Sequence, residues 1–238
     1  MNLLRFDGEP AWIDTICALW RDRLRANPTL RMCLPSGTTP APIYAEMSRR
    51  ARGGPVSFAR ATVFALDEFG GLAPDDPGRT RQTLQRQLLD AVDLPRESFR
   101  CLDPDAPDLA GHMAAFDEAI DAGIDLMILG IGLNGHLGMN EPGSDEASTT
   151  RRVDLHDSTI QSSARYFAHA QLPTWGVTVG LQAILGSHEV WLLANGRRKA
   201  DIVRRIVHGE VTTAVPASLL RRHPCCSLFV DAEAGSLV

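Results

Sequence analysis

Residues 124–131 read IDLMILGI, an apolar run with the length of a strand rather than of a helix. A run of this kind, without alternating polar positions, is typical of a strand that is buried on both faces. Similar runs occur at residues 29–34, 61–66, 175–180 and 189–194. These runs therefore predict a sheet whose two faces are both buried.

Segments with helical periodicity lie between these runs, with apolar residues three and four positions apart along one helix face. They cover residues 40–52, 80–92, 108–122 and 197–208. Alternating strands and helices favour a parallel sheet with right-handed crossovers. We predict an α/β fold with three αβα layers and a Rossmann-like, mostly parallel sheet, forming one domain over residues 1–238. The polar residues 140–150 are expected to form a loop.

Composition and charge exclude several classes of partner. The formal net charge is -5, whereas a nucleic-acid binder needs a basic surface, so we predict no nucleic-acid partner. No apolar stretch approaches the roughly 18 residues of a membrane helix, and the first residues lack the pattern of a signal peptide. We expect a cytoplasmic protein without a membrane partner. The five cysteines form no CxxC pair, and we expect reduced thiols.

Three of the apolar runs end in conspicuous loops. These loops read LPSGTTP at residues 34–40, LDEFGGLAPDDPG at residues 66–78 and GIGLNGHLGMNEPG at residues 130–143. In open parallel sheets, ligands bind beyond the carboxyl ends of the strands. We therefore expect the three loops to meet at one edge of the sheet and to form a binding site.

The first loop has the features of a phosphate-binding turn. Gly37 lets the backbone bend closely, Thr38 and Thr39 offer hydroxyls, and the start of a helix offers N–H groups. The alternative is an ordinary turn in which Thr39 caps the helix and Pro40 takes its first position. The loop matches neither a Walker motif nor GxGxxG.

The second loop brings two adjacent carboxylates, Asp67 and Glu68, to the same edge. A carboxylate at this position can act as a general base that removes a carbon-bound proton. The alternative is an acidic loop residue that caps a neighbouring helix. Position in the sequence does not decide between the two.

The third loop surrounds His136 with glycines, with Asn134 before it and Glu141 five residues after it. A histidine paired with a carboxylate can hold one tautomer and transfer protons near neutral pH. The alternative is a structural or merely solvated histidine. Because no second histidine lies at ligand spacing, we predict no metal site.

Basic residues follow in two places: Arg165 in SSARYF, and Arg197, Arg198 and Lys199 in NGRRKA. Cations at the start of a helix oppose the helix dipole, so their presence favours a bound anion. The alternative is a solvated basic face.

Taken in order, LPSGTTP, LDEF, NGHLGMNEP, the Arg165 segment and the GRRKA segment resemble the glucosamine-6-phosphate deaminase/isomerase family. The resemblance extends over nearly the whole chain and includes PTWGVTVG and AVPASLLRRHP. It implies an enzyme without metal or organic cofactor that converts a hexosamine 6-phosphate to a ketohexose 6-phosphate and ammonia. The partner would be a small sugar phosphate, and a homo-oligomer remains an open alternative.

The resemblance also implies a role for each site residue. Asp67 would move the proton between C2 and C1, and His136, oriented by Glu141, would open the sugar ring. The 6-phosphate would be bound by Gly37, Thr38, Thr39, Arg165 and Lys199.

The chain departs from the family pattern near the sugar. Many members have Asp where Asn134 stands, Phe69 and Gly70 replace Tyr-Val, and Arg79 and Thr80 replace Ser-Tyr. These changes leave the epimer open, either glucosamine or galactosamine 6-phosphate.

Two other functions compete with this prediction. Related 6-phosphogluconolactonases share the phosphate loop and the histidine, but there the histidine motif continues toward Leu-Phe-Pro and the acidic loop reads Asp-Glu-Arg. This chain has Glu141-Pro142 and Phe69 at those places. A non-catalytic sugar-phosphate-binding regulator is the other alternative, but it would not need Asp67, His136 and Glu141 together.

Overall fold

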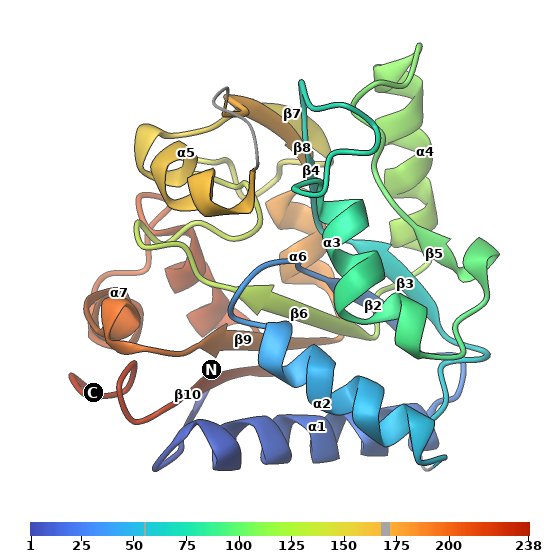
Figure 1. The fold of residues 1–238 in the computed structure, drawn as a ribbon. Coiled ribbons are helices and arrows are strands. Elements are labelled where there is room, and N and C mark those ends of the chain that lie inside the picture. Colours follow the sequence, from blue (N-terminus) through green and yellow to red (C-terminus); the bar gives the residue numbers. More distant parts are fainter. Residues whose placement is uncertain (55, 168–171) are drawn as a thin grey trace.

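The computed structural model describes residues 1–54, 56–167 and 172–238, except for the side chain of Arg165. Figure 1 shows a central sheet between two layers of helices. This architecture confirms the predicted α/β class.

The central sheet has seven strands in the order β1-β10-β9-β6-β2-β3-β5. Every neighbouring pair in it is parallel. Its strands are β1 (Asn2–Arg5), β10 (Cys226–Val230), β9 (Glu189–Ala194), β6 (Leu126–Gly130), β2 (Arg31–Leu34), β3 (Thr62–Ala65) and β5 (Phe99–Arg100). The order is that of an open doubly wound sheet, in which the chain after β1 enters at β2, adds β3 and β5 on one side and then β6, β9 and β10 on the other, with β1 at the edge beside β10.

Side chains alternate between two hydrophobic cores along the inner strands. In β6, Leu126 and Ile128 pack into one core, whereas Met127 and Leu129 pack into the other. This alternation is the reason that these strands read as unbroken apolar runs.

Helices cover each face of the sheet. The first face is covered by α1 (Glu9–Ala26), α2 (Ala41–Arg52) and α3 (Thr80–Gln87). The second face is covered by α4 (Leu109–Asp121), α6 (Leu181–Gly186) and α7 (Ala200–His208). Short helical turns complete the chain: η1 (Leu89–Ala91), η2 (Arg96–Ser98), α5 (Asp157–Ser163), η3 (Ala164–Tyr166), η4 (Arg197–Lys199) and η5 (Pro216–Arg222).

One predicted strand belongs to a different sheet. Residues 175–180 were expected in the parallel sheet, but β8 (Trp175–Thr178) pairs antiparallel with both β4 (Asp67–Phe69) and β7 (Arg151–Asp154). The expectation was wrong because an apolar run reports burial and not pairing direction. Here Val177 is buried in the second core without joining the central sheet.

Other boundaries also differ from the prediction. The helix expected over residues 80–92 ends at Gln87 and continues as η1, and the one over residues 197–208 begins with the turn η4. The strands β1, β4, β5, β7 and β10 and the helices α1, α5 and α6 were not predicted. Of these, α1 does carry a helical signal, because it buries residues at helical spacing, among them Trp12, Ile16 and Trp20. The strands β1 and β10 are neighbours at one edge of the central sheet.

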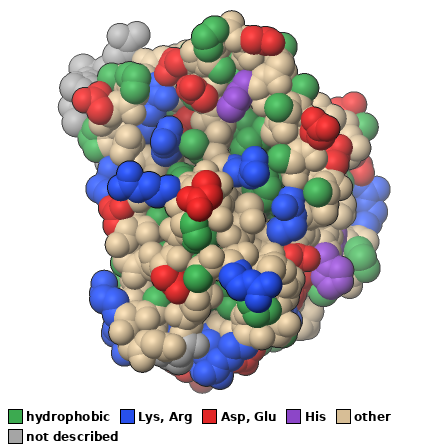
Figure 2. Space-filling model, turned by 90° about the vertical axis from the view of Figure 1, so that its right-hand side faces the viewer, with side chains coloured by type: hydrophobic (Ala, Val, Ile, Leu, Met, Phe, Trp, Pro, Cys, Tyr) green, Lys and Arg blue, Asp and Glu red, His purple; other side chains and the backbone are tan. Residues whose placement is uncertain are grey.

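The surface and the helix lengths bear on possible partners. Figure 2, which views the right-hand side of Figure 1, shows acidic and basic side chains interspersed over that face. Within the part of the chain that the structure describes, no helix combines the length and apolarity needed to cross a bilayer.

Candidate active site

A pocket of about 530 Å³ lies beyond the carboxyl ends of β2, β3, β6 and β9. The three loops singled out in the sequence contribute to its wall, together with α5 and the segment after β9. The lining includes Gly37, Thr38, Thr39, Asp67, His136, Thr159, Tyr166, Asn195, Arg197, Arg198 and Lys199. The expected meeting of the loops at one sheet edge is therefore observed.

The adjacent carboxylates of the second loop have different surroundings. Glu68 is 1% exposed and accepts hydrogen bonds from the backbone N–H groups of Phe69 at 2.8 Å, Thr80 at 2.8 Å and Arg81 at 3.0 Å. It thereby caps the N-terminus of α3, where the helix leaves N–H groups unpaired. Both interpretations of the pair apply, one to each residue: Glu68 caps a helix and Asp67 lines the pocket.

Asp67 is a half-buried carboxyl group at the pocket wall. Its Oδ1 accepts a hydrogen bond from Thr80 Oγ1 at 3.0 Å. Burial raises the pKa of Asp67 to about 6, although the Thr80 hydrogen bond and the charge of His136 act in the opposite direction. A carboxylate with such a pKa is ionised at neutral pH and more basic than an ordinary aspartate, which suits a general base.

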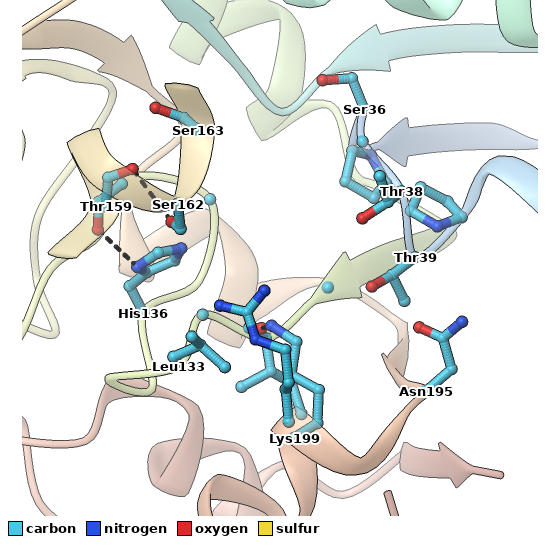
Figure 3. Close-up of a pocket in the computed structure, with 18 of the residues that line it drawn as sticks. Ser36, Thr38, Thr39, Leu133, His136, Thr159, Ser162, Ser163, Asn195 and Lys199 are labelled. Atoms are coloured by element: carbon cyan, nitrogen blue, oxygen red, sulfur yellow. Dashed lines mark hydrogen bonds between the residues drawn. The ribbon is translucent and has the colours of Figure 1, made fainter. Parts of the chain in front are cut away.

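The imidazole of His136 is held through Nδ1. This nitrogen lies 3.2 Å from Thr159 Oγ1 and 3.5 Å from Glu141 Oε2. Figure 3 shows Thr159 contacting the ring from α5. A Cβ atom at Gly132 would come within 2.3 Å of the ring, so the close packing of the loop against His136 requires glycine there. Because both contacts use Nδ1, we expect Nε2 to serve a ligand.

Asn134 and Glu141 support the histidine from below the pocket surface. Asn134 Nδ2 donates to Glu141 Oε2 at 2.8 Å, and Asn134 Oδ1 accepts from the His136 backbone N–H at 3.1 Å. Burial alone would raise the pKa of Glu141, but His136, Thr159 and Asn134 outweigh it and lower that pKa to about 2. Glu141 is therefore a permanent negative charge beside the imidazole, and Asn134 orients that charge without adding one.

The phosphate-loop candidates occupy the side of the pocket opposite His136 (Figure 3). Gly37 has a φ of 118°, which favours glycine. The hydroxyl of Tyr166 lies 3.4 Å from both the backbone N and the Oγ1 of Thr38. The backbone N–H of Thr38 therefore faces the hydroxyl oxygen of Tyr166.

Basic side chains line this part of the pocket. Lys199 Nζ donates to the carbonyl of Ile131, and Arg197 and Arg198 also line the wall. The backbone of Arg165 lies in η3, but its side chain lies outside the described part of the structure. Of the five residues proposed to bind phosphate, Gly37, Thr38, Thr39 and Lys199 therefore line one pocket.

Three residues of the site were not assigned a contact from the sequence: Thr80, Thr159 and Tyr166. Thr159 follows His136 by 23 positions and Tyr166 follows Thr38 by 128. Contacts between positions so far apart carry no local sequence signal. No cluster of three or more His, Cys, Asp or Glu residues with metal-ligand geometry occurs within residues 1–54, 56–167 and 172–238.

Comparison with known proteins places this site in a family. The model of the glucosamine-6-phosphate isomerases/6-phosphogluconolactonase family matches residues 10–228. The chain belongs to this family. The match includes all three loops that line the pocket.

Several relatives that match over most of their length are named glucosamine-6-phosphate deaminase. The one from Beutenbergia cavernae is 40% identical, over 94% of this chain and 85% of its own length. The one from Shouchella clausii is 35% identical, over 100% of this chain and 97% of its own. A solved structure, a monomeric glucosamine-6-phosphate deaminase, matches with a TM-score of 0.96 and 30% identity over 100% of both chains.

The lactonase branch of the family is structurally more distant. The 6-phosphogluconolactonase from Thermotoga maritima is 18% identical and matches with a TM-score of 0.76, over 97% of this chain and 99% of its own. At this level of identity, the likeness reflects the shared fold alone.

Proposed function

We propose that this chain is a hexosamine-6-phosphate deaminase, which converts glucosamine 6-phosphate and water to fructose 6-phosphate and ammonia. The observation that carries the proposal is the arrangement of one pocket. A carboxylate with a raised pKa, Asp67, and a carboxylate-supported imidazole, His136, both face a cavity that also contains a glycine-containing anion loop.

The phosphate group binds at the loop after β2. Gly37, Thr38 and Thr39 supply a close backbone approach and hydroxyls, and Lys199 and Arg165 supply positive charge. Binding at this end holds a flexible open-chain sugar over Asp67. Such positioning contributes several kcal/mol to catalysis in general.

Ring opening uses the imidazole. His136 gives a proton through Nε2 to the ring oxygen as the C1–O bond breaks, and the neutral imidazole then takes the proton of the C1 hydroxyl, which leaves the aldehyde. Glu141 stays ionised and stabilises the imidazolium form before this transfer.

Isomerisation and deamination follow on Asp67. The carboxylate removes the proton from C2 while His136 gives a proton to the C1 oxygen, which gives an enolamine. Asp67 then returns its proton to C1, which leaves an iminium group at C2. Water adds to C2, one of its protons passes to the nitrogen, and ammonia leaves as the neutral imidazole takes the remaining hydroxyl proton, so the product is the ketose 6-phosphate.

The lactonase alternative is less well supported. Lactone hydrolysis needs an activated water and has no carbon-bound proton to move, so it would not use Asp67 as a base toward carbon. The relatives that are 35% and 40% identical are named glucosamine-6-phosphate deaminase, whereas the compared lactonase is 18% identical. A binding protein without catalysis would likewise not need both Asp67 and the His136–Glu141 pair.

The proposed function also includes a domain organisation, a cellular location and an oligomeric state. We infer that residues 1–238 work as one catalytic domain in amino-sugar metabolism, and that the enzyme acts in the cytoplasm, where sugar phosphates are retained by their charge. The solved structure that matches with a TM-score of 0.96 is that of a monomeric glucosamine-6-phosphate deaminase. We therefore expect activity from a monomer, with oligomeric state measured by light scattering.

The test is ammonia release from glucosamine 6-phosphate and galactosamine 6-phosphate, beside hydrolysis of 6-phosphogluconolactone. Asp67→Asn keeps the shape of the side chain but removes the base, and should lower kcat at least about 100-fold. Binding of fructose 6-phosphate should change little, because Asp67 does not belong to the phosphate loop.

Two results would contradict the proposed function. If wild-type protein hydrolyses the lactone but releases no ammonia, or if Asp67→Asn deaminates at the wild-type rate, the assignment is wrong.

A further inference from the structure

Thr80 connects the two acidic residues that follow β3. It is fully buried and is the first residue of α3. Its backbone N–H donates to Glu68 Oε1 at 2.8 Å, and its side-chain hydroxyl donates to Asp67 Oδ1 at 3.0 Å. One residue thus fixes the helix cap and also contacts the proposed base.

The hydroxyl of Ser36 sets the direction in which the Thr80 hydroxyl donates. Ser36 Oγ donates to Thr80 Oγ1 at 3.4 Å, a long hydrogen bond. A hydroxyl has a single hydrogen, so when Thr80 accepts from Ser36 its own hydrogen points to Asp67. Ser36 belongs to the loop that carries Thr38 and Thr39, and Figure 3 shows it at the end of that loop.

We propose that Thr80 is a positioning residue for the deamination, an inference that rests on the proposed function. Its hydroxyl holds Oδ1 of Asp67, which leaves Oδ2 as the oxygen that meets the substrate carbon. Through Ser36 it also links the base to the loop proposed to bind phosphate. Thr80 acts through Asp67 and does not touch the substrate.

The chemical consequence concerns both geometry and basicity. A carboxylate with one oxygen held by a buried donor cannot rotate freely, so the second oxygen keeps one direction. A hydrogen bond to the ionised form also opposes the effect of burial on Asp67. Removing the hydroxyl should therefore raise the pKa of Asp67 and loosen its orientation.

The decisive variant is Thr80→Val, which keeps the branched shape and the backbone N–H but removes the hydroxyl. The acid limb of the kcat/KM profile for glucosamine 6-phosphate should move to higher pH by about one unit. We expect kcat at neutral pH to fall about tenfold, with KM nearly unchanged. Thr80→Ser restores the donor and should return the limb to its wild-type position.

Thr83→Val is the matched control. Thr83 lies one turn further along α3, is 9% exposed, and donates to the carbonyl of Pro77 at 3.3 Å, away from the pocket. This variant loses a comparable hydrogen bond and should leave the acid limb in place. If Thr80→Val does not fold, Thr80→Ala removes the same hydroxyl with a smaller side chain.

A titration of carboxyl carbons by NMR provides a readout that does not need turnover. The Asp67 signal, assigned by its loss in Asp67→Asn, should titrate at higher pH in Thr80→Val than in wild type. An unchanged titration, or a Thr80→Ser variant that shifts as far as Thr80→Val, overturns the inference. If wild type releases no ammonia, the proposed function fails instead, and the NMR comparison still decides the role of Thr80.

Discussion

Asp67 and Glu68 are neighbours in the sequence, and β4 sends their side chains in opposite directions because successive residues of a strand alternate. Glu68 meets the N-terminus of α3, whereas Asp67 meets the pocket. Burial raises the pKa of both carboxyls, to about 7 and about 6. Chemically similar groups therefore take different roles according to the N–H groups within reach.

We predict that the hydroxyl of Tyr166 contributes to phosphate binding. This hydroxyl lies 3.4 Å from the backbone N of Thr38, beside the anion loop. With a phosphate bound, we expect this hydroxyl to donate to a phosphate oxygen, a contact worth about 1 kcal/mol. Tyr166→Phe should raise KM for glucosamine 6-phosphate about fivefold and leave kcat within about twofold.

Inhibition by inorganic phosphate separates this role from an effect on the sugar. The inhibition constant should rise in Tyr166→Phe by about the same factor as KM. An unchanged inhibition constant would mean that the hydroxyl does not contact the phosphate.

At the scale of elements, the N-terminus of α3 depends on a residue outside the helix. The residue before the helix, Arg79, makes no side-chain cap hydrogen bond, and Glu68 accepts the first two helical N–H groups instead. A carboxylate at this end is favoured by the helix dipole. The chain thus ties β4, which carries the proposed base, to the start of α3.

The pH dependence of stability tests whether burial or the N–H donors of the cap dominate the pKa of Glu68. Burial raises the pKa of Glu68 from 4.5 to about 7, so the folded state holds the proton more tightly than the unfolded state. The stabilising contribution of Glu68 is therefore complete below pH 4.5 and is lost as the pH rises to about 7. Relative to Glu68→Gln, the unfolding free energy of wild type should fall across this window and level off above it.

Urea unfolding at intervals between pH 4 and 8 measures this difference. Asp67→Asn is the matched control, since its own window ends at about pH 6. A difference between wild type and Glu68→Gln that stays constant, or grows with pH, would contradict the raised pKa of Glu68, because it would mean that the three N–H donors offset the effect of burial.

Strands and helices were predicted accurately where burial alone produced the pattern of apolar residues. The strand over residues 189–194 has the predicted bounds, because every side chain after Glu189 is buried between the two cores. Residues 175–180 show the limit: β8 is buried like a central strand, yet it pairs antiparallel with β4 and β7. Periodicity records which faces are buried, and strand direction is decided by the path of the chain.

At the scale of the whole molecule, the pocket forms only when distant segments assemble. The loop after β2 and the turn η4 are more than 150 residues apart, and both line the cavity. A ligand that binds there should bind the folded state and not the unfolded chain. Bound sugar phosphate should therefore stabilise the entire fold.

Thermal unfolding with fructose 6-phosphate provides the measurement. At a concentration 100-fold above its dissociation constant, the ligand should add about 2.7 kcal/mol, and Tm should rise by roughly 5 °C or more. Lys199→Met should reduce this increase, because it removes a positive charge from the pocket wall. An equal increase in both proteins would argue against phosphate binding at Lys199.

The amino-acid sequence was enough to predict the layered α/β class, the order of the three loops and the residue types in them, because these features follow from local periodicity and from short motifs. The three-dimensional contacts were needed to assign Glu68 as the cap of α3 and Asp67 as a pocket residue, and to show that Thr80 and Thr159 contact Asp67 and His136. Such contacts join residues from different elements, and their distances depend on how the layers pack.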